Sequence, residues 1–156
     1  MRADLEIIQQ WVKPGHHVLD LGCGDGTLLD FLKRERNASG FGLEINPDHI
    51  TTCMNRGVSV IEQNLDTQGL DNFEDNSFDI VLMTQALQAV RRPDKVLDEM
   101  LRLGDEGIVT FPNFAHWRLR WGLALSGRMP ESDALPYKWY NTPNIRLCTF
   151  KDFEAL

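Results

Sequence analysis

The sequence predicts an α/β fold, a doubly wound and mostly parallel sheet with helices on both faces. Three observations predict it. Apolar runs of strand length alternate with helix-length segments as far as residue 111. The first run ends in a glycine-rich turn and the second ends in an acid, Glu44. The length of 156 residues suits one domain with an ordinary core, so we expect a single domain over 1–156.

The first part of the chain begins with a helix and a strand joined by a turn at Pro14 and Gly15. Leu28, Phe31 and Leu32 recur at helical spacing, which predicts a second helix. In chain order we expect a helix over about 4–11, a strand over about 17–21, a helix that ends near residue 36 and a strand over about 40–44.

The second part repeats this alternation. Asn46 is typical of an N-cap, Pro47 of a first helical position and Gly57 of a C-cap. Further on we expect a helix over about 47–56, strands over about 58–63, 78–83 and 107–111, and a helix that starts at Pro93 and turns Val96, Leu97, Met100 and Leu101 inward.

The turn after the first strand is the clearest sign of a ligand site. The residues that form it are Asp20, Gly22, Cys23, Gly24 and Gly26. Glycines allow a sharp turn and a close approach of the backbone to a ligand. Glu44, at the end of the second strand, can accept both hydroxyls of a ribose. The pattern predicts a nucleoside-type ligand; a tight turn without a ligand is the alternative.

The spacing argues against a dinucleotide. A G-x-G-x-x-G motif needs a third glycine where Thr27 stands, and the charge of Asp20 would repel a pyrophosphate but attract a cation. The D-x-G-x-G-x-G pattern resembles motif I of the class I S-adenosylmethionine-dependent methyltransferases. The resemblance implies their Rossmann-like fold and S-adenosylmethionine or S-adenosylhomocysteine as cofactor. It also implies two more strands, so we expect the C-terminal strands to be missing from this chain.

The same resemblance implies further cofactor-binding residues. Many of these enzymes have an acid after the third strand that contacts the adenine amino group. Asn64 takes that place, Leu65 could supply a backbone N–H and an apolar contact, and Asp66 is the competing candidate. Ile45, after the second strand, and Gln85, after the fourth, complete the expected set.

A general base is harder to find. The family often has a pair of histidines after the fourth strand, but residues 84–90 contain none. His116, just past the fifth strand, is the candidate that remains, although a histidine in an aromatic segment more often packs than catalyses. His49 sits on a helix.

An aromatic-rich segment follows the fifth strand. Phe114, Trp117, Trp121 and Leu125 lie at helical spacing. They can form a helix packed on the sheet, a lid over a small substrate or a docking surface. We favour docking because Trp, Tyr and Arg dominate interface energetics, and we assign 112–148 as an aromatic-rich cap or docking segment.

Motifs within this segment resemble the methionine biosynthesis protein MetW family, and the resemblance extends over essentially the whole chain. The motifs are Phe111–Trp117, Gly127–Pro130 and Leu135–Cys148. The resemblance implies a homoserine O-acyltransferase of the α/β-hydrolase type as partner. We expect it to bind the docking segment near Trp117, Trp121 and Trp139. Two functions stay open: a nucleoside-sensing partner of that enzyme, or an active methyltransferase on a small molecule.

Composition excludes other classes. The net charge of −7 disfavours a general nucleic-acid binder. No stretch approaches the ~20 apolar residues of a membrane span. Cys23, Cys53 and Cys148 are scattered without a C-x-x-C pair, so we expect neither a disulfide framework nor a metal site. A reducing, cytoplasmic location fits best.

Overall fold

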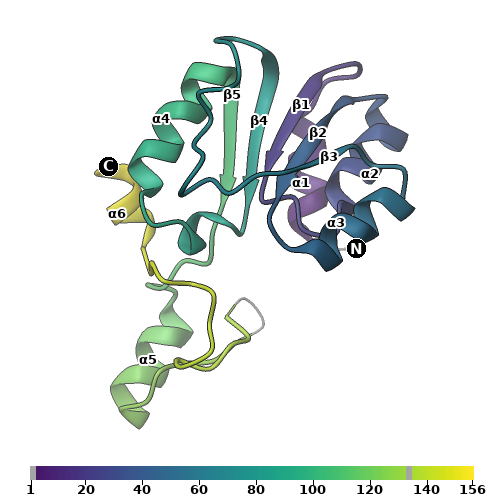
Figure 1. The fold of residues 1–156 in the computed structure, drawn as a ribbon. Helices are drawn as coiled ribbons and strands as arrows, with labels where there is room; N and C mark the ends of the chain where they lie inside the picture. Colours follow the sequence, from purple (N-terminus) through teal and green to yellow (C-terminus); the bar gives the residue numbers. More distant parts are fainter. Residues whose placement is uncertain (1–2, 133–134) are drawn as a thin grey trace.

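The sheet is parallel throughout and changes direction of winding at its centre. The computed structural model describes residues 3–132 and 135–156. Over these residues five strands pair in the order β3-β2-β1-β4-β5 (Figure 1). They are β1 (His17–Leu21), β2 (Ser39–Glu44), β3 (Val60–Glu62), β4 (Phe78–Thr84) and β5 (Gly104–Thr110). The chain winds outward from β1 to β3 and then crosses to β4, so the topological switch point lies between β1 and β4.

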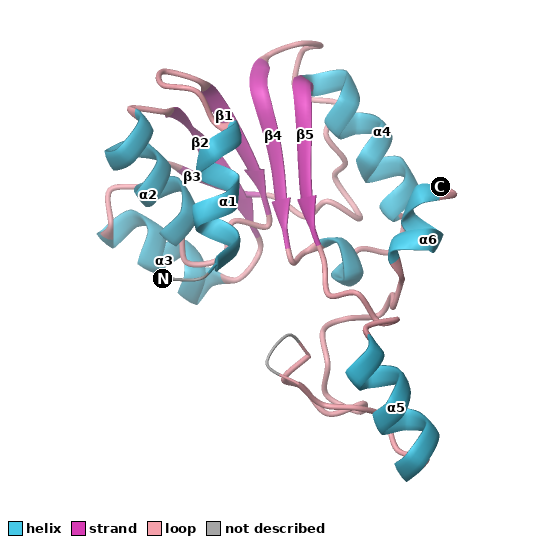
Figure 2. Ribbon diagram, turned by 180° about the vertical axis from the view of Figure 1, so that it is seen from behind, coloured by secondary structure: helices cyan, strands magenta, loops and turns pink. Residues whose placement is uncertain are grey.

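Helices cover both faces of the sheet (Figure 2). One face carries α1 (Ala3–Trp11), α2 (Thr27–Arg36) and α3 (Pro47–Asn55); the other carries the short 3-10 turn η1 (Leu87–Ala89) and α4 (Pro93–Leu103). Successive strand residues point to opposite sides. Val18 and Ile80 therefore join the first core, and Leu19 and Val81 join the second. The predicted doubly wound α/β fold is confirmed.

Most predicted boundaries are confirmed to within three residues. The strand over 58–63 is shorter, because β3 lies at the edge of the sheet and pairs only with β2. β5 starts at Gly104, where the exposed acids Asp105 and Glu106 conceal the strand pattern. The inward placement of Leu101 was wrong: its side chain is 70% exposed. It follows the buried Met100 by one residue, which turns it about 100° away around the helix.

The aromatic-rich segment extends away from the sheet (Figures 1 and 2). Its helix α5 (Trp117–Ser126) begins after Phe114. Phe114 is therefore not part of the helical apolar face that the sequence predicts. Trp117 and Trp121 are each 60% exposed, and Leu119 is the buried residue of this helix. The interpretation as a helix packed on the sheet was therefore wrong.

The two ends of this segment meet at its base. The backbone N–H of Phe114 donates to the carbonyl of Cys148 over 3.1 Å. The ring of Phe111, just after β5, packs against Phe150 and Phe153 of α6 (Phe150–Glu154), with ring centres 5.3 and 5.0 Å away. The two ends of the aromatic-rich segment are thus attached to the α/β domain next to η1. Among the described helices none has the length and apolar character needed to cross a membrane.

Candidate functional site

A cleft of about 390 Å³ opens at the carboxyl ends of the strands, at the topological switch point. Ligands of open α/β sheets bind at this place, and the volume lies in the ordinary range for small-molecule sites. The residues that line it are Gly22, Gly24, Leu43, Glu44, Ile45, Asn46, His49, Gln63, Asn64, Leu65, Asp66, Thr84, Gln85, Ala86, Ala89 and Val90.

The glycine turn forms one wall and requires glycine at Gly22. This residue has a φ of 72°, and its N–H donates to the carbonyl of Leu43 over 2.9 Å. A Cβ at Gly22 would lie 2.9 Å from the Cβ of Ala86, too close for a real contact. At Gly24, with a φ of 56°, a Cβ would meet nothing within 4 Å. The turn is therefore packed against the loop after β4 and has open space beside Gly24.

Glu44 joins the second strand to this turn. Its carboxylate is largely buried and accepts three backbone hydrogen bonds: from Gly24 over 2.8 Å at Oε2, and from Ile45 and Asn46 over 2.9 Å each at Oε1. A carboxylate has about four acceptor positions. One position therefore remains for a ligand hydroxyl in this conformation, and a second ribose hydroxyl would have to displace a backbone N–H.

His49 also lines the cleft, with Nδ1 3.8 Å from Oε2 of Glu44. The sequence alone indicates that His49 lies on a helix, but not that it faces the cleft. Its position in the first turn of α3 was the available signal, because helical side chains lean toward the N-terminus of their helix. The N-cap Asn46, whose side chain accepts from the backbone N–H of Asp48 over 2.9 Å, directs that end of α3 to the cleft.

Three of the expected binding residues, Asp20, Cys23 and Gly26, are not among the residues that line the cleft. Asp20 is fully buried in β1 between β2 and β4. Burial, reinforced by the charge of Asp20, raises the pKa of the Cys23 thiol. Gly26 has a φ of 74°, and a Cβ there would lie 2.8 Å from Sγ of Cys53. Asp20 and Cys23 are thus buried, and at Gly26 a larger side chain would not fit.

Asn64 and Asp66, the two candidates for contact with the adenine amino group, both line the cleft. The side-chain carbonyl of Asn64 accepts from the backbone N–H of Asp66 over 2.9 Å. The Asp66 carboxylate in turn accepts from the backbone N–H of Arg91 over 2.8 Å. Each oxygen has a further lone pair for a ligand. Leu65 packs against the apolar core and presents an apolar surface between them.

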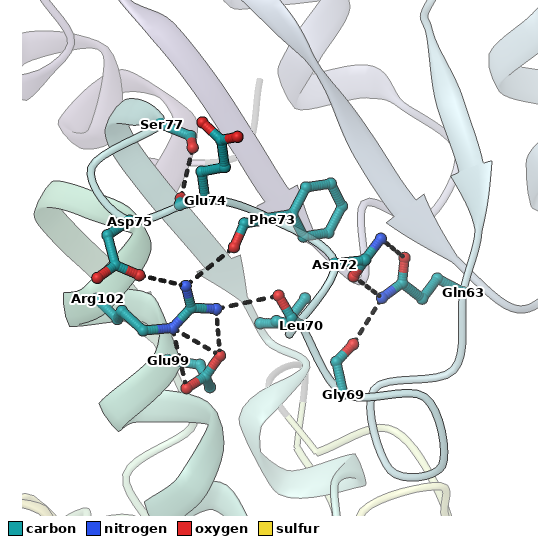
Figure 3. A network of polar contacts seen from close by, with 10 residues as sticks. All are labelled: Gln63, Gly69, Leu70, Asn72, Phe73, Glu74, Asp75, Ser77, Glu99 and Arg102. Atoms are coloured by element: carbon teal, nitrogen blue, oxygen red, sulfur yellow. Dashed lines mark hydrogen bonds and ion pairs between the residues drawn. The ribbon is translucent and has the colours of Figure 1, made fainter.

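The chain that continues from this wall to β4 is held by Arg102 of α4 (Figure 3). Its guanidinium donates to the carbonyls of Phe73 and Leu70 over 2.9 and 3.1 Å, and pairs with Asp75 and Glu99 over 2.7 and 2.6 Å. A second set of bonds joins Gln63 Nε2 to the carbonyl of Gly69 and the Asn72 side chain, over 2.6 and 3.1 Å. The wall is thus fixed from both ends of the loop.

The comparisons with known proteins agree with this geometry. The family model described as methionine biosynthesis protein MetW matches residues 2–156. The chain belongs to the MetW family. It is 36% identical over 165 residues to the bifunctional methionine biosynthesis protein MetXA/MetW of Rhodopirellula baltica, a match that covers all of this chain and 26% of that protein. Membership of the MetW family links the chain to methionine biosynthesis.

More distant relatives and structural neighbours include proteins named as methyltransferases. The chain is 26% identical over 159 residues to the demethylmenaquinone methyltransferase of Symbiobacterium thermophilum, covering 85% of this chain and 62% of the enzyme. Among solved structures, an S-adenosylmethionine-dependent methyltransferase of Thermotoga maritima aligns with a TM-score of 0.69 at 20% identity, covering 98% of this chain and 66% of the other. The YcgJ protein of Bacillus subtilis aligns with a TM-score of 0.70 at 16% identity, covering 99% and 66%. The class I methyltransferase fold is therefore shown. The chain spans less than two thirds of the length of each of these four proteins.

The wall after β4 differs from what methyl transfer to oxygen or nitrogen would favour. In this MetW-family chain the lining residues from Thr84 to Val90 include no carboxylate, imidazole or thiol. Gln85 lies there with a φ of 55°, and its N–H donates to the carbonyl of Thr110 over 2.9 Å. His116 is exposed at the N-cap of α5, beside the ring of Trp117, and does not line the cleft.

Proposed function

We propose that this chain binds S-adenosylmethionine or S-adenosylhomocysteine in the cleft and supports or regulates a homoserine O-acyltransferase as its partner. One observation carries the proposal: the cleft has what a nucleoside needs, while its wall after β4 offers no acid–base group. Binding without chemistry is the function that this combination supports best, because a hydroxyl or amine acceptor usually needs its proton removed.

The cleft suits a nucleoside on both polar and apolar grounds. Glu44 offers an acceptor for a ribose hydroxyl, and Asn64 and Asp66 offer acceptors for an amino group. The apolar side chains of Leu43 and Leu65 line the cleft, where they can contact a base. The negative charges of Asp20 and Glu44 favour a cationic ligand over a phosphorylated one.

Two observations support the acyltransferase as partner. In Rhodopirellula baltica MetXA and MetW are named together as one bifunctional protein, which would keep the two parts at high effective concentration. In this chain the aromatic segment exposes Trp117, Trp121 and Trp139 on a projection from the sheet. Exposed tryptophans gathered in one segment are typical of an interface.

Two measurements test the proposal. Titration calorimetry of the protein with S-adenosylhomocysteine should give saturable binding at one site per chain. Size-exclusion chromatography with the acyltransferase of the same organism should give a joint peak. No nucleoside binding would remove the first half of the proposal, and separate peaks at micromolar concentration would remove the second.

An active methyltransferase on a small molecule is the second candidate. It is favoured by Asp66 and His49, which are titratable and line the cleft, although neither belongs to the wall after β4. Release of S-adenosylhomocysteine from S-adenosylmethionine, measured with a panel of small hydroxylated and amine acceptors, tests it. Turnover that depends on the acceptor would establish the enzyme.

A further inference from the structure

The loop over 85–92 lies between the nucleoside cleft and the base of the aromatic segment. On one side it supplies Gln85, Ala86, Ala89 and Val90 to the cleft. On the other side the carbonyl of Gln88 accepts two backbone hydrogen bonds from the aromatic segment, from Ile145 over 2.8 Å and from Arg146 over 2.9 Å. One short loop therefore contacts both the cleft and the aromatic segment.

Two side chains hold the far end of this loop at one residue, Arg91. Its backbone N–H donates to Oδ1 of Asp66 over 2.8 Å, and Asp66 lines the cleft. Its carbonyl accepts from Nη2 of Arg146 over 3.0 Å, and Arg146 belongs to the aromatic segment. A shift of Asp66 toward a ligand would therefore move Arg91, the residue whose carbonyl binds Arg146.

The loop also contains two unfavourable features that another arrangement would relieve. Gln85 has a φ of 55°, in the left-handed region that residues other than glycine rarely adopt. The side chain of Gln88 is 2% exposed, and neither its oxygen nor its nitrogen has a hydrogen-bond partner among the described residues. A buried amide without partners favours any conformation that pairs it. The loop is therefore suited to adopt a second arrangement.

We propose that the loop over 85–92 couples nucleoside binding in the cleft to the aromatic segment, with Arg146 as the residue that transmits the change. The inference rests on the proposed function, because it requires a nucleoside in the cleft. A nucleoside that hydrogen-bonds to Asp66 and contacts Gln85 shifts the loop. The hydrogen bonds that the carbonyls of Gln88 and Arg91 accept then transmit this shift to residues 145–146. By linkage, a partner bound to the aromatic segment alters nucleoside affinity by the same factor.

Hydrogen exchange of the isolated protein tests the path without any partner. The reporters are the backbone N–H groups of Ile145 and Arg146, which lie outside the cleft lining. Saturating S-adenosylhomocysteine should change their exchange rates by about fivefold or more, the lower range of ordinary coupling. In Arg146→Met the nucleoside should still bind, but the change should be smaller than in wild type, because the bond to the Arg91 carbonyl is lost and only the backbone bonds to the Gln88 carbonyl remain. Arg146→Lys keeps a charged donor and should restore part of it.

Arg128→Met is the matched control, since Arg128 is an exposed arginine of the same segment and should leave the change intact. The second readout is the ratio of nucleoside dissociation constants with and without the acyltransferase, which should move toward one in Arg146→Met alone. Nucleoside binding with no change at residues 145–146, or an unaltered ratio in Arg146→Met, would overturn the inference while leaving the proposed function standing. No nucleoside binding to the wild-type protein would overturn both.

Discussion

Oε2 of Glu44 accepts a hydrogen bond from the backbone N–H of Gly24 over 2.8 Å, and this bond joins β2 to the glycine turn after β1. It ties the turn that follows β1 to the last residue of the neighbouring strand β2, and both residues line the cleft at the switch point. It also engages the carboxylate that the sequence assigns to the ribose. The same side chain thus organises the site and is the one that we propose to bind the ribose.

Replacing Glu44 tests this double role. In Glu44→Ala we expect nucleoside affinity to fall by about 10- to 100-fold, since hydrogen bonds to a charged group contribute about 1.5–3 kcal/mol. Titration calorimetry measures the loss. Glu62→Ala is the control, because Glu62 pairs with Glu44 across the strands but is exposed and outside the cleft lining. Equal affinities in wild type and Glu44→Ala would contradict the ribose assignment.

The contact between the turn and the loop after β4 gives a second prediction. Gly22→Ala should lower the free energy of unfolding by more than about 1 kcal/mol and weaken nucleoside binding, because the new Cβ meets the Cβ of Ala86 and the φ is positive. Gly15→Ala separates the two causes, since Gly15 has a φ of 82° and open space around it. Urea unfolding compares the two variants. The double variant with Ala86→Gly should recover the part due to the clash, and no recovery would disprove it.

The exposed face of α5 gives a third prediction. Trp121→Ala should weaken the acyltransferase complex by about 2 kcal/mol or more, as an interface tryptophan does, and leave Tm within about 2 °C. The reason is that Trp121 is exposed and makes little contact within the chain. Leu119→Ala, on the buried side of the same helix, should lower Tm instead. A large loss of Tm in Trp121→Ala would mean that the tryptophan belongs to the core.

Most of the fold could be predicted from local signals. β1 was predicted at its observed bounds, because an apolar run between Gly15 and Gly22 has no competing period. Asn46 and Pro47 likewise specified the start of α3. α5 could not be placed, because apolar residues at helical spacing show which face is apolar and not what lies against it. Trp121 fits a core position and an interface position equally well in the sequence.

The lining of the cleft was predictable at positions where the motif itself requires a particular residue type. Gly22, Gly24 and Glu44 all line the cleft, as their motif implies. The position of His49 in the cleft lining and the burial of Asp20 within β1 depend on tertiary packing, which spacing along the sequence cannot specify. The roles of these residues toward a ligand stay predictions.

The buried thiol of Cys23, in the glycine turn, gives a fourth prediction. Burial and the charge of Asp20 raise the pKa of Cys23 in the folded protein above its ordinary value. Its contribution to stability is therefore complete below the ordinary thiol pKa of about 8.5 and is lost as the pH rises toward the higher folded value. The free energy of unfolding should fall above about pH 9, by up to ~1.4 kcal/mol per pH unit for each such thiol.

Urea unfolding between about pH 7 and 10 measures this slope, and Cys23→Ala should make it shallower. Burial also raises the pKa of Cys53, so part of the slope should persist in the variant. An identical slope in wild type and Cys23→Ala would show that the Cys23 thiol has no raised pKa.

The central claim is that nucleoside binding and partner binding belong to one regulatory protein. The most direct measurement is the rate of homoserine acylation by the cognate acyltransferase, alone and with this protein, each with and without S-adenosylmethionine. We predict that the protein raises the rate and that the nucleoside changes the size of the increase. A rate that the protein leaves unchanged, with or without the nucleoside, would contradict the account.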